Sequence, residues 1–241
     1  MPNHDAGLRE AIRLFWRTRD QQSKRQGSRK DRDRGTRGAV TGGKQMDGFI
    51  RLVHDLLIAA EVPEECIAID KRVELPGWFR AEKKWDLVVV HNHQLLAAME
   101  FKSQVGPSFG NNFNNRTEEA LGSATDIWAA YREGAFKPSS RPFLGYLMLL
   151  EDSDRSRSPV KVIEPHFAVF PEYKSASYRE RYAILIEKLL RDRLYDGACF
   201  LLSHGGAAVS GDYIEPHPEL TFAKFVTLLV AQVSAICSPQ G

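Results

Sequence analysis

Residues 84–102 read KWDLVVVHNHQLLAAMEFK and hold two apolar runs in tandem. The polar pair Asn92-His93 separates the runs, which predicts a β-hairpin with strands over 86–91 and 94–102. Side chains alternate between the two faces of a strand, so residues two apart lie on the same face. The hairpin therefore determines which of its charged side chains can meet.

Charged residues stand at the ends of these two strands. Asp86 begins the first, and thirteen residues separate it from Glu100 in the second, which Lys102 follows two positions later. Two carboxylates beside an amine suit Mg²⁺-assisted hydrolysis of a phosphodiester, with the backbone carbonyl of Phe101 as a further oxygen ligand. Lys102 would orient or help to deprotonate the attacking water, or hold the phosphate. A structural Glu–Lys ion pair at two exposed strand ends is the alternative. The spacing Asp-x(13)-Glu-x-Lys resembles the PD-(D/E)XK nuclease motif.

The remaining pattern predicts one α/β domain over residues 1–241, with a central mixed sheet flanked by helices. Apolar residues at helical spacing predict a short helix over 6–17, and continuous apolar runs predict buried strands. Residues 152–159 are expected to form a charged, mobile loop. The other expected helices are 46–60, one that begins near residue 115, 177–193 and 221–236, and the other strands are 67–73, 143–151 and 198–203.

Positive charge is concentrated near the N-terminus. Residues 17–44 contain ten Lys or Arg and three Asp, so their net charge is +7. Because the net charge of the whole chain is +2, the remaining residues sum to −5. Such a segment, with Lys44 at its end, can neutralise phosphates of a nucleic acid. A mobile, solvated segment is the alternative interpretation, and both hold if the segment orders on DNA.

Residues 106–116 read GPSFGNNFNNR and are expected to form a loop. Asn112, Asn114, Asn115 and Arg116 are candidate DNA contacts, because Asn can read adenine and Arg can read guanine in the major groove. The alternative is a loop whose amides satisfy its own backbone. Asn115 and Glu118 have the spacing of a capping box at the start of the next helix.

Asp47 stands at the start of an apolar helix and is a possible accessory acid for the metal site. A carboxylate that simply favours the positive end of the helix is an equally good interpretation. The three cysteines are far apart and form no Cys-x-x-Cys, which favours a reducing compartment over a disulfide framework. The N-terminus is polar and no apolar run is long enough to span a membrane, so a cytoplasmic protein is expected.

Several stretches together resemble the XhoI-type restriction endonucleases. They are GKQMDGFI at 43–50, KWD at 84–86, EFKSQVGPSFGNNFNNR at 100–116 with its continuation TEEA, and PHF at 165–167. The resemblance covers roughly residues 40–185, and the run from Glu100 to Arg116 is its most specific part. Trp85 stands where the general nuclease motif has Pro.

The resemblance implies a type II restriction enzyme with a restriction-endonuclease-like core. It implies a homodimer that cuts both strands of the palindrome CTCGAG with Mg²⁺ and leaves 5′ overhangs, with Asp86 and Glu100 as metal ligands and Lys102 as the motif lysine. A companion DNA methyltransferase is expected in the host. Three rival functions stay open: a repair or junction-resolving nuclease on the same core, a DNA-binding protein without catalysis, and an α/β interaction domain with a basic tail.

Overall fold

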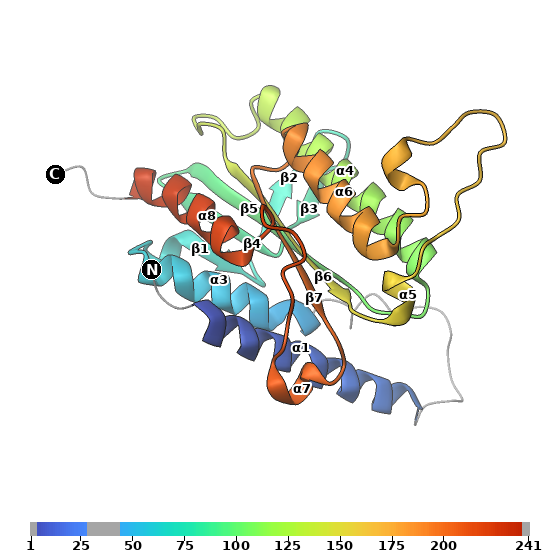
Figure 1. The fold of residues 1–241 in the computed structure, drawn as a ribbon. Coiled ribbons are helices and arrows are strands. Elements are labelled where there is room, and N and C mark those ends of the chain that lie inside the picture. Colours follow the sequence, from blue (N-terminus) through green and yellow to red (C-terminus); the bar gives the residue numbers. More distant parts are fainter. Residues whose placement is uncertain (1–3, 28–43, 238–241) are drawn as a thin grey trace.

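The computed structural model describes residues 4–27 and 44–237 of the chain. A five-stranded sheet forms its centre, in the order β1-β4-β5-β6-β7 (Figure 1). The pairs β1–β4 and β4–β5 are antiparallel, whereas β5–β6 and β6–β7 are parallel, so the predicted mixed α/β sheet is confirmed. The strands are β1 (Ile67–Ile69), β4 (Leu87–His91), β5 (Gln94–Gln104), β6 (Phe143–Glu151) and β7 (Gly197–Ser203).

The predicted hairpin is formed by β4 and β5. Asn92 and His93 make its two-residue turn with φ values of 48° and 62°. Positive φ at both turn residues matches the right-handed twist of paired strands, and Asn tolerates that region better than most residues. A register shift between Val89 and Val90 leaves Leu96 of the second strand unpaired, so the bulge lies in β5. The hairpin thus aligns Asp86, just before β4, with the end of β5 that carries Glu100.

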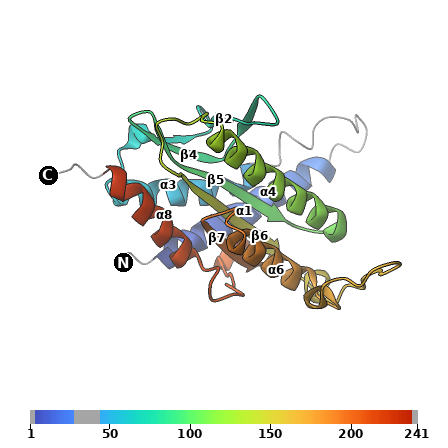
Figure 2. The same cartoon turned by 90° about the horizontal axis from the view of Figure 1, so that it is seen from above.

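Helices cover both faces of the sheet (Figures 1 and 2). One face packs against α1 (His4–Gly27), α3 (Asp47–Ala59) and α8 (Phe222–Cys237), and the other packs against α4 (Phe109–Arg132) and α6 (Tyr178–Arg191). Met99 and Phe101 belong to the first core and Ala98 to the second. Glu100 and Lys102 share the parity of Ala98, so they project toward α4.

Shorter elements connect these layers. A two-stranded antiparallel ribbon of β2 (Glu74–Pro76) and β3 (Glu82–Lys84) precedes the hairpin. No helix of the described ranges is long and apolar enough to cross a membrane. The remaining elements are η1 (Lys44–Met46), η2 (Glu64–Cys66), α5 (Asp154–Arg157), η3 (Pro171–Tyr173) and α7 (Ala207–Ser210).

The prediction of a loop over 106–116 was wrong from residue 109 onward. Helix α4 begins at Phe109 with Ser108 as its N-cap residue, so the expected capping box of Asn115 and Glu118 does not exist. Asn is a weak helix former, but packing overrides propensity here. Phe109 stacks on Tyr178 of α6 with ring centroids 5.6 Å apart. Phe113 contacts the rings of Tyr178 and Tyr182, which are both in α6.

The first helix and the expected loop at 152–159 also differ from prediction. Helix α1 continues to Gly27 rather than ending near residue 17, because its last turns consist mostly of Arg, Gln and Lys, which are good helix formers. The part of the basic segment at 28–43 lies outside the described residues. Helix α5 forms within 152–159, where the N–H of Ser153 donates to Oγ of the buried Ser156 at 2.9 Å. The predicted strand over 67–73 ends at Ile69 and is followed by positive φ at Asp70.

Candidate active site

The structure brings together the three residues predicted to carry catalysis. Asp86 immediately precedes β4, and Glu100 and Lys102 lie on the neighbouring β5. The backbone N–H of Phe101 donates to Oδ2 of Asp86 at 2.7 Å, and the N–H of Asp86 donates to the carbonyl of Met99 at 3.1 Å. These two bonds fix the Asp86 carboxylate against the stretch of β5 that carries Glu100 and Lys102.

Glu100 is the buried centre of this site. Its side chain is 3% exposed, and Oε1 lies 2.7 Å from Nζ of Lys102 and 3.0 Å from Nζ of Lys83. A buried carboxylate is stable only when its charge is compensated, which the two ammonium groups achieve. The second oxygen, Oε2, is buried and has no hydrogen-bond partner. One carboxylate oxygen is therefore still available to bind a cation.

The site residues perturb one another's pKa values. Burial raises the pKa of Glu100, but the ammonium groups of Lys102 and Lys83 outweigh this effect, so its pKa lies below the ordinary value. Burial lowers the pKa of Lys102, and the carboxylates of Glu100 and Asp86 reverse that shift, so its pKa is raised. Burial also raises the pKa of Asp86 despite the opposing charge of Lys102. The Glu100–Lys102 pair is thus held in its charged form.

Lys83 was not predicted from the sequence. It lies on β3, whose pairing with β2 was also missed, and its Nζ stands 4.4 Å from the ring centroid of Trp85 as well as beside Glu100. Trp85 itself is 2% exposed and belongs to the core on the α4 side. The residue that replaces the Pro of the general nuclease motif therefore anchors the strand and positions Lys83.

A cavity of about 470 Å³ opens beside these groups. Glu118 and Glu119 of α4 contribute carboxylates to its wall, and Arg80 contributes a guanidinium. None of the three was predicted to lie at the site, because only the packing of α4 and of the β2–β3 ribbon brings them there. The complete lining is Arg80, Lys83, Glu100, Lys102, Glu118, Glu119, Gly122 and Ser123.

The donor set of the site fits Mg²⁺. This ion takes one or two protein carboxylates and keeps several water ligands. Asp86 and the free Oε2 of Glu100 match that requirement, whereas a site of three or more His, Cys, Asp or Glu residues is absent from the part of the chain that the structure describes. Phe101 lies between the two motif side chains, so its carbonyl stays the predicted further ligand.

Lys44 begins the short helix η1, and Asp47 begins α3, which packs on the other face of the sheet. Burial raises the pKa of Asp47, and the nearby carboxylates of Asp70 and Asp86 add to the shift. This segment is tied to β5 by the buried Gln45, whose Nε2 donates to Oγ of Ser103 at 2.7 Å. Asp47 is thus within electrostatic range of Asp86, and Lys44 is exposed. Their roles stay predictions.

The predicted DNA-contacting residues form one segment of α4. Asn114 and Asn115 are exposed, Asn112 is half-buried, and the side chain of Arg116 is 28% exposed and paired with Glu119. Because this segment is helical, the exposed amides project from a rigid element rather than from a loop. They lie in the first turns of α4, the helix that follows the catalytic strand β5.

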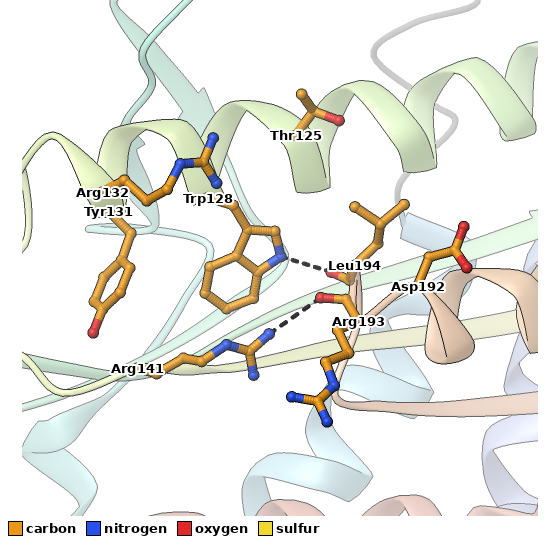
Figure 3. Close-up of a pocket in the computed structure, with 8 residues that line it drawn as sticks. All are labelled: Thr125, Trp128, Tyr131, Arg132, Arg141, Asp192, Arg193 and Leu194. Atoms are coloured by element: carbon orange, nitrogen blue, oxygen red, sulfur yellow. Dashed lines mark hydrogen bonds between the residues drawn. The ribbon is translucent and has the colours of Figure 1, made fainter.

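A second hollow of about 370 Å³ lies near the C-terminal end of α4 (Figure 3). Trp128 and Arg141 stack in it, with the guanidinium carbon 4.1 Å from the ring centroid. Trp128 Nε1 donates to the carbonyl of Leu194, and Arg141 donates to the carbonyl of Arg193 (Figure 3). These bonds join α4 to the turn that precedes β7, so the hollow has a structural explanation and none of the residues predicted for catalysis lines it.

Known proteins resemble this chain closely. The type II restriction enzyme BstVI of Geobacillus stearothermophilus is 51% identical over 208 residues, which cover 84% of this chain and 93% of that protein. The type II restriction enzymes XhoI of Xanthomonas vasicola and AbrI of Azospirillum brasilense are 41% and 46% identical, covering 79% and 69% of this chain and 77% and 75% of their own lengths. No solved structure matches significantly. The family model described as restriction endonuclease XhoI matches residues 24–215, and the chain belongs to this family.

Proposed function

We propose that this protein is a Mg²⁺-dependent type II restriction endonuclease that cuts both strands of a palindromic DNA duplex. The observation that carries the proposal is the free, buried Oε2 of Glu100, which lies in one site with Asp86 and Lys102. A carboxylate oxygen buried without a partner is costly unless a cation binds it. Family membership supports DNA cleavage as the reaction, and the resemblance to XhoI-type enzymes supports CTCGAG as the target.

Asp86 and Glu100 would hold the Mg²⁺ ion, with the carbonyl of Phe101 as a further ligand; such an ion lowers the pKa of a bound water and neutralises developing charge on a phosphate. Lys83 and Lys102 both bind Oε1 of Glu100, so they leave Oε2 as the oxygen for the cation. Lys102 also lines the open cavity, which positions its ammonium group to orient the attacking water or to bind the scissile phosphate.

Helix α4 is our candidate for sequence reading. Exposed Asn side chains on a helix can enter the major groove and bind adenine through two hydrogen bonds, and Asn114 and Asn115 are free to do so without rearrangement. Arg116 is paired with Glu119, so reading guanine with Arg116 requires that ion pair to open. Asn112 and Lys44 complete the proposed DNA-contacting set, with Lys44 binding a phosphate.

A palindromic target implies a two-fold symmetric enzyme, so we propose a homodimer in which each protomer cuts one strand. The proposed place of action is the cytoplasm of a prokaryotic cell, with the host's own sites protected by a DNA methyltransferase that need not bind this protein.

Digestion of a plasmid with mapped CTCGAG sites tests the proposal. We expect discrete fragments in Mg²⁺, no cleavage in EDTA, and no cleavage by Glu100→Ala. Glu133→Ala is the matched control, because Glu133 is exposed just beyond α4 and away from the site, and it should cut like the wild type. Failure of the wild type to cut in Mg²⁺ would refute the proposal, and a preference for branched DNA would favour a junction-resolving nuclease.

A further inference from the structure

The loop that joins β2 to β3 exposes two large aromatic side chains. Residues 77–81, here called the aromatic loop, include Trp78, which is 54% exposed, and Phe79, which is 72% exposed. Aromatic side chains of this size usually gain stability from burial. A loop that exposes two consecutive aromatic side chains to water therefore needs an explanation.

The backbone of the aromatic loop is held rigidly by a buried residue of α4. Asp126 has a side chain that is 4% exposed, and its Oδ1 accepts hydrogen bonds from the backbone N–H groups of Trp78 at 2.8 Å and Phe79 at 2.7 Å. Its Oδ2 accepts from Nε of Arg80 at 2.7 Å. Charged acceptors make strong hydrogen bonds. The buried carboxylate of Asp126 thus fixes the backbone of a loop whose aromatic rings remain exposed to solvent.

Close packing at Gly77 supports the same conclusion. A Cβ atom at Gly77 would lie 2.4 Å from Oδ2 of Asp126, which leaves no room for any side chain. The loop and the helix therefore fit each other closely at this point. Flexibility does not account for the exposed rings, because the backbone of Trp78 and Phe79 is hydrogen-bonded to Asp126 of α4.

The aromatic loop stands at the edge of the candidate active site. Arg80 lines the same cavity as Glu100 and Lys102. Strand β3 leads directly from the loop to Lys83, which binds Glu100, and the N–H of Trp85 donates to the carbonyl of Val73 at 2.9 Å. The exposed rings are thus rigidly connected to the residues that would hold the metal ion and the phosphate.

We infer that the aromatic loop is a DNA-binding element that holds the duplex next to the scissile phosphate. Trp78 and Phe79 contact deoxyribose and base surfaces, and Arg80 directs its remaining N–H groups to a phosphate. This chemistry matches the way apolar side chains and guanidinium groups grip DNA. The inference rests on the proposed nuclease function, and the continuity of the loop with the catalytic cavity selects DNA as its occupant.

Trp78 provides its own probe. The chain has four tryptophans, and the other three, Trp16, Trp85 and Trp128, are between 2% and 7% exposed. Quenching of fluorescence by acrylamide therefore reports mainly on Trp78. The full-length protein is titrated with a CTCGAG duplex in Ca²⁺, a larger ion with looser coordination than Mg²⁺, after electrophoresis has shown that the duplex stays intact. We expect Trp78 to be quenched readily in the free protein and several-fold less once DNA is bound.

The double variant Trp78→Ala/Phe79→Ala tests the energetic contribution. We expect its Kd for the duplex to rise about tenfold or more, as for an aromatic contact at the centre of an interface. Leu228→Ala is the matched control, because Leu228 is 51% exposed on α8 and α8 covers the opposite face of the sheet. Equal melting temperatures of variant, control and wild type would show that folding is unchanged.

Four results would overturn the inference, and they separate it from the proposed function. Unchanged quenching on DNA binding, or a double variant that binds and cuts like the wild type while Glu100→Ala does not cut, would reject the loop and leave the nuclease standing. A wild type that neither binds nor cuts the duplex would reject both. Shielding of Trp78 that is present without DNA and disappears on dilution would assign the loop to contact with a second copy of the chain.

Discussion

Asp126→Ala should destabilise the protein without touching a residue of the candidate metal site. The substitution removes the carboxylate group that accepts hydrogen bonds from three donors, namely the N–H groups of Trp78 and Phe79 and the guanidinium of Arg80. Hydrogen bonds to a charged group contribute about 1.5–3 kcal/mol each, but the loop can rehydrate and the half-exposed Arg80 pair contributes at most about 1 kcal/mol. We therefore expect a loss of about 3 kcal/mol.

Asp126→Asn separates the two halves of this interaction. An amide oxygen can still accept from the backbone of Trp78 and Phe79, whereas the ion pair with Arg80 is lost. We expect this variant to lose about 1 kcal/mol. The two effects correspond to a decrease in Tm of roughly 6–12 °C for the alanine variant and roughly 2–4 °C for the asparagine variant in a chain of this size.

The pH dependence of stability gives a further check. Burial raises the pKa of Asp126, but the hydrogen bonds from Phe79, Arg80 and Trp78 outweigh this effect. The pKa of Asp126 in the folded protein is therefore below the ordinary value of 3.8. A carboxylate with a depressed pKa stabilises the fold above its unfolded pKa and loses this contribution as pH falls through the folded pKa. The difference in unfolding free energy between wild type and Asp126→Asn should therefore be complete at neutral pH and shrink in acid.

Thermal unfolding and urea denaturation at several pH values measure these effects directly. Circular dichroism at neutral pH gives the order wild type, Asp126→Asn, Asp126→Ala in decreasing stability. An alanine variant as stable as the wild type would refute the account of the anchored loop. Equal loss in both variants with no dependence on pH would show that the carboxylate charge has no part in it.

Three further predictions concern Lys83 of β3, Trp85 next to it, and helix α4. Lys83→Met should reduce the single-turnover cleavage rate about tenfold, because one of two ammonium groups on Glu100 is lost; an unchanged rate would contradict the role of Lys83. Trp85→Pro restores the residue of the general nuclease motif but should destabilise the fold by about 3 kcal/mol or more in urea unfolding, since it removes a buried ring and the N–H bond to Val73. Asn115→Ala should weaken binding to the specific duplex by about 1–3 kcal/mol and leave nonspecific binding in a filter or anisotropy assay unchanged; equal weakening of both would exclude base reading.

The catalytic hairpin could be predicted because local rules determine it. Alternation along two short apolar strands and a tight turn at Asn92-His93 bring Asp86 near Glu100 and place Lys102 on the same face as Glu100. The register shift that sets Asp86 directly opposite Glu100 was not predicted. The parallel strands β6 and β7 were recognisable as continuous apolar runs, as expected for strands buried on both faces. These features need no knowledge of contacts between distant residues.

Other features depend on such contacts and could not be predicted. The Asn-rich stretch has the composition of a loop, and only the packing of Phe109 and Phe113 against α6 makes it helical. Asp126 reaches Trp78 and Phe79 across 48 and 47 positions of sequence, so nothing local indicated its role. Lys83 was missed for the same reason, since its partner Glu100 is seventeen positions away on another strand.

Cleavage of a short duplex with a single CTCGAG site tests whether Glu100 holds a catalytic metal ion. Wild type, Glu100→Ala and the control Glu133→Ala are compared in a single turnover with Mg²⁺ and with EDTA. We expect wild type and Glu133→Ala to cut both strands within the site in Mg²⁺ alone, whereas Glu100→Ala should bind the duplex but not cut it. Cleavage by Glu100→Ala at the wild-type rate, or by the wild type in EDTA, would contradict the assignment of Glu100 as a metal ligand.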